Sequence, residues 1–227
     1  MFNGGKAGAI IVAGGSSARM GGIDKMFAPL EGKPVLARVV AAFETAPSVD
    51  RIVLVLNSNN LERGRKLVES EGWQKVDAVI PGGALRQDSV RAGLAMAGDC
   101  KWVIIHDGAR PLVTVKLIED GLAAAAETGG ALCAVPVTDT ITEELDGFAV
   151  KTLPRERLRA AQTPQVFRAD IIKEAYALAQ GEFTDDASLV EAAGHRVKIY
   201  PGDYDNIKLT TPADLIMAGV IWRRKGC

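Results

Sequence analysis

The regular alternation of short apolar runs with amphipathic segments is the feature that most constrains the fold of this chain of 227 residues. Apolar runs rich in β-branched residues occupy residues 9–13, 51–56, 76–80, 102–106, 131–135 and 196–200. Between them lie helical patterns near residues 34–45, 60–71, 87–97, 115–127, 170–180 and 185–193. Short, all-apolar strands separated by helices are typical of a mostly parallel sheet covered on both faces. The sequence therefore predicts an α/β fold with a single Rossmann-like sheet flanked by helices.

Two further segments can be assigned from local chemistry. Thr211, Pro212 and Asp214 form a capping-box pattern that predicts a last helix. Residues 136–164 break the alternation, with two short strand patterns at 140–143 and 148–152 around a turn at Asp146-Gly147. Such a hairpin does not fit easily into a parallel sheet. We therefore expect one domain over residues 1–227, with an arm at about residues 137–163 that reaches onto a partner subunit.

Composition excludes several classes of function. The 27 basic and 28 acidic residues give a net charge of −1, which argues against a surface that coats nucleic acid. The longest apolar stretches, residues 7–13 and 131–137, are too short to cross a bilayer. The N-terminal residues lack the long apolar core and cleavage site of a signal peptide, and the three cysteines show no paired spacing. We expect a cytoplasmic protein without nucleic-acid or membrane partners and without a thiolate metal site.

A glycine loop follows the first predicted strand, with the sequence AGGSSARMGGIDK over residues 13–25. Glycines let the backbone approach a ligand closely, and successive N–H groups at Ala13, Gly14 and Gly15 can form an anion site. Arg19 and Lys25 add positive charge beside these donors, which suits a triphosphate. The patterns GxxxxGK[ST] and GxGxxG are absent from this loop. Taken alone, the loop is also compatible with a purely structural tight turn.

Two more blocks place polar residues where strands end. The block GGALRQDSVRAGL, residues 82–94, leads from a strand into a helix, and a helix N-terminus is a site for anionic or polar ligand groups. The block WVIIHDGARP puts Asp107 directly at a strand end, where a carboxylate can bind a ribose hydroxyl or a Mg²⁺ that bridges phosphates. His106 could serve as a base. An attacking phosphate already carries negative charge and needs no base, so the sequence favours a structural role for His106.

These blocks, in their order and spacing, resemble the 2-C-methyl-D-erythritol 4-phosphate cytidylyltransferases of the non-mevalonate isoprenoid pathway. The resemblance extends to PVTDT at residues 136–140, to a turn at Thr163-Pro164-Gln165, to TDDAS at residues 184–188 and to DNIKLT at residues 205–210. The glycine loop differs from that of many members in having one residue fewer between Arg19 and Lys25. The resemblance implies transfer of CMP from CTP to the sugar-alcohol phosphate with release of pyrophosphate, by a homodimer that uses Mg²⁺ or another divalent cation.

The same resemblance implies a set of functional residues. The candidate catalytic residues are Arg19, Lys25, Arg155 and Lys208. The candidate nucleotide-binding residues are Ala13, Gly14, Gly15, Gly83, Arg86 and Ser89. The candidate substrate-binding residues are Asp107, Arg110, Thr140, Arg155, Thr163 and Lys208, and Asp107 is also the candidate metal ligand.

Two other functions are compatible with the sequence pattern. One is a cytidylyltransferase for another polyol phosphate, such as ribitol 5-phosphate. The discrimination between these acceptors would rest on the arm and on the Lys208 region. The other is a non-catalytic, nucleotide-binding regulator on the same fold. Arg19, Lys25, Asp107 and Lys208 argue against the regulator, because a sensor could dispense with cations that stabilise a transition state.

Overall fold

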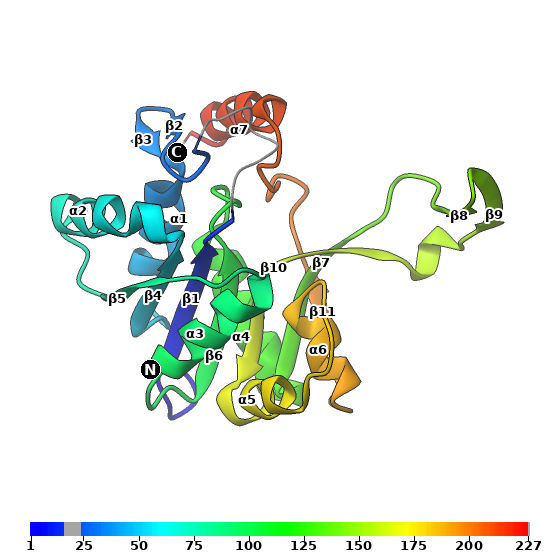
Figure 1. The fold of residues 1–227 in the computed structure, drawn as a ribbon, viewed down its shortest axis with the longest axis horizontal. Coiled ribbons are helices and arrows are strands. Elements are labelled where there is room, and N and C mark those ends of the chain that lie inside the picture. The colour runs from blue at the N-terminus through cyan, green and yellow to red at the C-terminus, as the bar shows by residue number, and fades with distance from the viewer. Residues whose placement is uncertain (16–23, 227) are drawn as a thin grey trace.

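The central element is a mostly parallel β-sheet, as the sequence predicts (Figure 1). The computed structural model describes residues 1–15 and 24–226. The sheet has the order β11-β7-β10-β6-β1-β4-β5. Its strands are β1 (Ala7–Ala13), β4 (Arg51–Leu56), β5 (Val76–Pro81), β6 (Trp102–Asp107), β7 (Gly130–Pro136), β10 (Arg159–Arg168) and β11 (Lys198–Pro201). All neighbours pair in parallel except β10, which runs antiparallel between β6 and β7.

Strand β10 corrects two expectations from the sequence. Residues 159–163 were assigned to the arm, but they already pair with β7 inside the sheet. Thr163-Pro164-Gln165 was expected to form a turn, yet it lies within β10 and contains a cis Thr163–Pro164 peptide bond. The pairing of β10 with β7 shifts register between Ala161 and Gln165, which accommodates the proline. Proline and buried polar residues in the same run concealed this strand, because both normally argue against a central strand.

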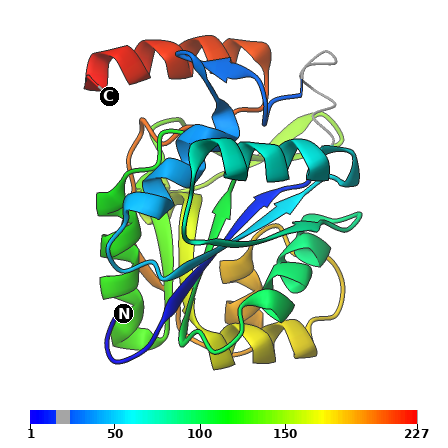
Figure 2. The same cartoon turned by 90° about the vertical axis from the view of Figure 1, so that its left-hand side faces the viewer.

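The helices cover both faces of the sheet (Figure 2). On one face lie α1 (Val35–Thr45), α2 (Leu61–Glu71) and α4 (Val115–Thr128), and on the other lie α3 (Arg86–Met96), α5 (Ala169–Leu178) and α6 (Asp186–Ala192). Successive side chains of a strand point to opposite faces, so Ile11 packs in the first apolar cluster and its neighbour Ile10 in the second. Both faces of β1 are therefore buried, which explains why its sequence is apolar throughout.

The C-terminal helix α7 (Pro212–Lys225) packs beside a small hairpin of β2 (Pro29–Leu30) and β3 (Lys33–Pro34). The capping box predicted for α7 is confirmed, because Thr211 Oγ1 accepts the Asp214 N–H and the Asp214 carboxylate accepts the Thr211 N–H at 2.7 Å. Among the helices in the described part of the chain, none combines the length and apolar character needed to cross a bilayer.

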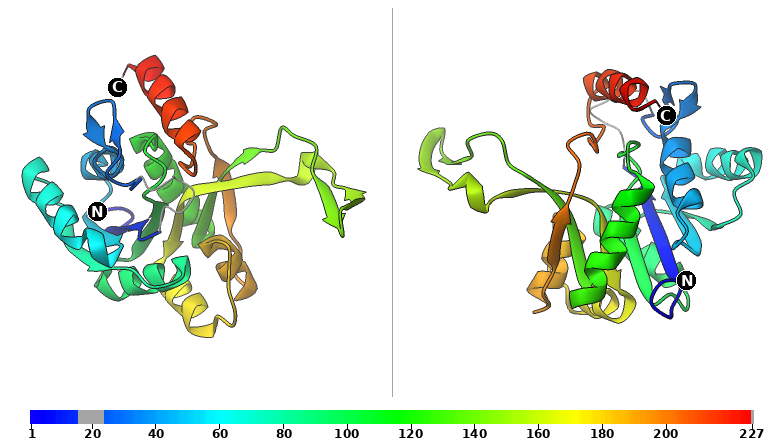
Figure 3. Two further views of the ribbon diagram at one scale, coloured as in Figure 1. Left: turned by 45° about the horizontal axis from the view of Figure 1, so that its top comes forward. Right: turned by 180° about the vertical axis from the view of Figure 1, so that it is seen from behind.

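The predicted hairpin arm is present and projects from one side of the sheet (Figures 1 and 3). It consists of β8 (Thr142–Leu145) and β9 (Phe148–Thr152), so its first strand begins two residues later than expected. Asp146 and Gly147 have φ values of 53° and 84°, as a two-residue turn of type I′ requires. Leu145 and Phe148 beside the turn are 65% and 76% exposed. Apolar side chains of this size are thus left uncovered in the single chain.

Candidate active site

A cavity of about 210 Å³ opens where the parallel strands end. In the sheet β1 lies between β4 and β6, and Val12 pairs with Asp107. The chain continues from β1 through α1 to β4 on one side and from β6 through α4 to β7 on the other. Ligands of open α/β sheets bind at such a switch point, outside the carboxyl ends of the strands. The residues that line the cavity are Val12, Ala13, Gly14, Gly15, Lys25, Met26, Gly83, Ala84, Leu85, Arg86, Ser89, Asp107 and Lys208. The fold thus brings together nine of the residues selected from the sequence.

The loop between β5 and α3 forms one wall of the cavity. Ser89 is buried, and its Oγ accepts the Gly83 N–H at 3.2 Å and donates to the Leu85 carbonyl at 3.3 Å. A Cβ added to Gly82 would lie 2.5 Å from Ser89 Oγ, and one added to Gly83 would lie 2.3 Å from Asp88 Cβ. The two glycines are needed because the loop packs directly against the first turn of α3. Ser89 consequently shapes this wall by holding the loop.

A second wall carries a network of charges centred on Asp107. Arg86 Nε donates to one carboxylate oxygen of Asp107 at 3.1 Å, and Lys208 Nζ lies 2.7 Å from the other. Burial by itself would raise the pKa of Asp107, but the charges of Arg86 and Lys208 outweigh burial and hold that pKa well below its usual range. Asp107 is therefore ionised at neutral pH and draws two cations to the edge of the cavity.

Behind this wall, His106 and Thr163 fix the end of β6. His106 is fully buried, and burial lowers its pKa to about 4, so the ring is neutral at pH 7. The carbonyl of Arg110, 3.2 Å from Nε2, can only accept a hydrogen bond, so Nε2 carries the proton. Nδ1 then accepts from the Thr163 hydroxyl at 2.9 Å, while the same hydroxyl accepts the Asp107 N–H at 3.0 Å. His106 does not line the cavity, and its bonds give it a structural role.

We expect Thr163→Val to destabilise the fold by about 2–4 kcal/mol, because it leaves the Asp107 N–H and His106 Nδ1 buried without partners. Urea unfolding measures this loss. Thr45→Val is the matched control, since Thr45 is exposed on α1 and bonds only to carbonyls of its own helix. The control should stay within about 0.5 kcal/mol of the parent. Equal stability of Thr163→Val and the parent would contradict the role assigned to this hydroxyl.

Lys208 reaches Asp107 because its segment is tied to the loop after β6. Leu209 N–H donates to the Ala109 carbonyl at 2.8 Å, and Arg110 Nη1 donates to the Asn206 carbonyl at 2.7 Å. Arg110 is half-buried and does not line the cavity among the described residues. In this structure it therefore supports the segment that carries Lys208.

Lys25 is held in place by its neighbours, one of which the sequence analysis overlooked. Asp24 accepts the Met26 N–H at 3.1 Å with one carboxylate oxygen and the Asn60 side chain at 2.7 Å with the other. The Met26 carbonyl accepts the Leu36 N–H at 2.9 Å, which ties this segment to α1. The position of an Asp immediately before the candidate catalytic Lys25 was the available signal for this anchoring role.

Four of the described residues selected from the sequence do not line the cavity: Arg110, Thr140, Arg155 and Thr163. Arg19 falls in residues 16–23, outside the described residues. Thr140 and Arg155 belong to the arm and do not line the cavity, and Arg155 Nη1 donates to the Thr138 carbonyl at 3.0 Å. Thr163 contributes from behind the cavity, through the Asp107 N–H.

The donor set around Asp107 does not form a self-contained metal site. In the described ranges 1–15 and 24–226, no cluster of three or more His, Cys, Asp or Glu side chains could hold a metal ion. Both oxygens of Asp107 also have a cationic partner. Among the described residues that line the cavity, Asp107 is the one that offers a carboxylate to a divalent cation.

The fold and the cavity define a class of protein: an α/β protein whose cavity at the carboxyl ends of its strands is lined by a glycine loop and by Lys25, Arg86 and Lys208. Comparison with known proteins makes the class specific. Residues 7–224 match the family model described as 2-C-methyl-D-erythritol 4-phosphate cytidylyltransferase. The chain belongs to this family and is therefore a cytidylyltransferase, as the resemblance in its motifs predicts.

Individual relatives agree with this assignment. A cytidylyltransferase of the same description from Dehalococcoides mccartyi is 52% identical over 225 residues, which cover 99% of both chains. The crystal structure of a 4-diphosphocytidyl-2C-methyl-D-erythritol synthase from Anaerococcus prevotii superposes with a TM-score of 0.86 at 27% identity, over 98% of both chains. A 2-C-methyl-D-erythritol 4-phosphate cytidylyltransferase from Thermus thermophilus superposes with a TM-score of 0.79 at 30% identity, over 94% of this chain and 98% of that one.

Proposed function

We infer that this enzyme transfers the cytidylyl group of CTP to 2-C-methyl-D-erythritol 4-phosphate, as a step of the non-mevalonate isoprenoid pathway. An oxygen of the acceptor phosphate attacks the α-phosphorus of CTP. A phosphorus–oxygen bond to the acceptor forms, and the bond to pyrophosphate breaks. The observation that carries the proposal is the convergence of a glycine loop with Lys25, Arg86 and Lys208 on one cavity at the strand ends. Phosphoryl-type transfer depends on such positioning and charge stabilisation.

We assign the two walls of the cavity to the two parts of the reaction. The backbone N–H groups of Gly14 and Gly15 and the charge of Lys25 suit the triphosphate, where negative charge grows at the leaving group. Arg19 precedes Lys25 in the same glycine-rich segment of the sequence, and we include it in the proposal because of this position. Lys208, held at Asp107, suits the anionic acceptor. No covalent intermediate with the enzyme is needed.

We propose that the divalent cation enters with CTP as part of the substrate. Mg²⁺ commonly keeps several waters and is bound through substrate phosphates and one or two carboxylates. A single carboxylate, that of Asp107, fits this pattern better than a metal site built from protein ligands alone. The cation would neutralise charge on the pyrophosphate leaving group.

We further propose that the working unit is a homodimer in which the arm completes the partner's active site. The arm carries Thr140 and Arg155 away from the cavity of its own chain. Its exposed apolar residues Leu145, Phe148 and Val150 would be covered by a partner surface. An isolated two-stranded hairpin is marginal in water, which also favours packing against another surface.

The base and the acceptor can be tested together by offering the four nucleoside triphosphates with methylerythritol 4-phosphate or ribitol 5-phosphate and measuring pyrophosphate release. We expect CTP to be preferred over UTP by about 100-fold or more, because a site built for one hydrogen-bonding edge leaves a buried group unpaired with the other. We expect methylerythritol 4-phosphate to be the better acceptor. Equal use of CTP and UTP would overturn the base preference and leave nucleotidyl transfer standing. A preference for ribitol 5-phosphate would overturn the acceptor.

A further inference from the structure

We propose that Asp186, held by Tyr176, is a positioning residue for Arg86. By binding one end of the Arg86 guanidinium, it limits Arg86 to one carboxylate oxygen of Asp107 and leaves the other oxygen to Lys208. Arg86 Nη1 donates to Asp186 Oδ2 at 2.8 Å, while Arg86 Nε donates to Asp107 Oδ1 at 3.1 Å. The Asp186 side chain is 0% exposed and does not line the cavity, so it can act only through Arg86. This inference rests on the proposed role of Arg86 in the nucleotide site.

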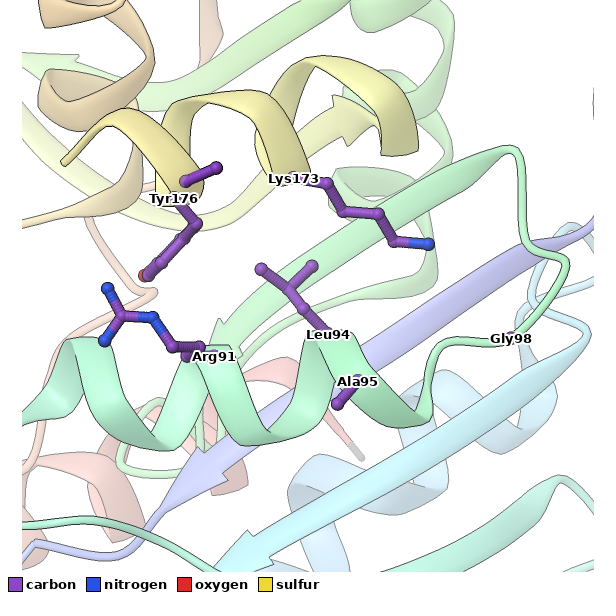
Figure 4. Close-up of a pocket in the computed structure, with 7 residues that line it drawn as sticks. Arg91, Leu94, Ala95, Gly98, Lys173 and Tyr176 are labelled. Carbon is purple, nitrogen blue, oxygen red and sulfur yellow. The ribbon is translucent and has the colours of Figure 1, made fainter.

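The position of Asp186 is fixed by contacts independent of Arg86. Tyr176 on α5 donates its hydroxyl hydrogen to Asp186 Oδ1 at 2.7 Å. Figure 4 shows Tyr176 on α5 beside Arg91 of α3, whose guanidinium carbon lies 5.5 Å from the centre of the Tyr176 ring. Tyr176 is thus itself held between the two helices. The buried carboxylate cannot turn away from Arg86 without losing the tyrosine.

The start of α6, where Asp186 lies, is also clamped to the strand next to β6. Gln165 of β10 accepts the Ala187 N–H at 2.9 Å and donates to Asp185 at 2.9 Å. Gln165 pairs with Ile105, two residues before Asp107 in β6. Asp186 and Asp107 are consequently connected through the paired strands β10 and β6, and Arg86 bridges them from the first turn of α3.

The chemistry of arginine explains why this bridge matters. A guanidinium has a planar fork of donors that readily forms a bidentate pair with a single carboxylate. If Asp186 is replaced by a neutral residue, the Arg86 guanidinium can turn toward Asp107 and bind both of its carboxylate oxygens. One of these is Oδ2, which lies 2.7 Å from Lys208 Nζ. The Arg86 side chain would then leave the position from which it lines the cavity. Asp186 prevents this by binding one end of the fork.

Steady-state kinetics of the full-length enzyme with CTP can test the inference. Asp186→Asn keeps the side-chain volume and removes the charge, and it should lower kcat/KM for CTP by about 10–100-fold, the loss typical of a residue that orients a binding group. Tyr176→Phe removes only the hydroxyl and should lower kcat/KM several-fold, which provides a milder variant if Asp186→Asn folds poorly. Asp170→Asn is the matched control, because Asp170 is an exposed carboxylate on α5 that pairs with Arg168 and does not contact Arg86. It should leave kcat/KM within about twofold of the parent and change stability by no more than about 0.5 kcal/mol.

A double-mutant cycle separates positioning from a purely structural effect. If Asp186 acts through Arg86, then Asp186→Asn causes no further loss of kcat/KM in an Arg86→Ala background. Losses that multiply in the double variant would overturn the inference, as would an unchanged kcat/KM in folded Asp186→Asn when Arg86→Ala alone is impaired. Full activity of Arg86→Ala would instead overturn the proposed role of Arg86, and the inference with it.

Discussion

Replacing Lys25 by Ala is expected to lower kcat by about 30- to 1000-fold, equivalent to about 2–4 kcal/mol in the activation barrier, the range found for other preorganised charge stabilisers. Lys25 lines the cavity, and the bonds of Asp24 and Met26 hold the backbone on either side of it. The backbone that carries Lys25 therefore does not have to move as negative charge develops on the triphosphate. Steady-state measurement of kcat at saturating CTP and acceptor checks this expectation.

Lys33→Ala is the control for the Lys25 substitution. Lys33 lies in the same segment of the chain, is exposed, and pairs with Glu71 at 2.6 Å outside the cavity. Its removal should change stability by no more than about 0.5 kcal/mol and leave kcat unaltered. An unchanged kcat in a folded Lys25→Ala enzyme would remove Lys25 from the catalytic residues.

Two inactive variants are expected to restore activity to each other when their subunits exchange. If each site uses Lys25 from one chain and Arg155 from the partner's arm, a mixed dimer of Lys25→Ala and Arg155→Ala chains contains one intact site and one doubly altered site. Random exchange of equal amounts makes half of the dimers mixed, so about one quarter of the parent activity should return in a two-fold symmetric dimer. Activity assays before and after exchange, with the oligomeric state followed by light scattering, provide the measurement.

The control for this experiment mixes two variants whose altered residues line the same cavity of one chain. Lys25→Ala mixed with Lys208→Ala should regain nothing, because Lys25 and Lys208 line one cavity and the partner cannot supply either of them. A fully active enzyme that remains monomeric would contradict the shared site. So would an absence of recovery in dimers shown to have exchanged.

The sequence predicted correctly those elements whose structure depends on their own residues and not on residues elsewhere in the chain. Strand β1 is buried on both faces, so every position in it must be apolar, and the pattern is visible without knowledge of its neighbours. The capping box of α7 and the Asp146-Gly147 turn are also local, because each is fixed by the backbone angles and side-chain oxygens of a few adjacent residues.

Strand β10 and the Asp186 contact were not predicted, because their physical cause lies far away in the sequence. Gln165 and Thr163 can occupy a central strand only because α6 and β6 supply hydrogen-bond partners for their side chains. Asp186 can be buried only because Tyr176 and Arg86 meet it there, the latter from 100 residues away. A pattern of apolar residues carries no information about such pairings.

The sequence by itself determined the α/β class, the order of most strands and helices, the hairpin arm and the motifs that identify the family, since all of these depend on local periodicity or on short blocks of residues. The tertiary structure alone decided which of those residues share a cavity. It placed Lys25, Arg86, Asp107 and Lys208 at one edge of the sheet and carried Thr140 and Arg155 away from it. The reason is topological: parallel strands from distant parts of the chain end at the same edge, whereas the arm leaves the sheet between β7 and β10.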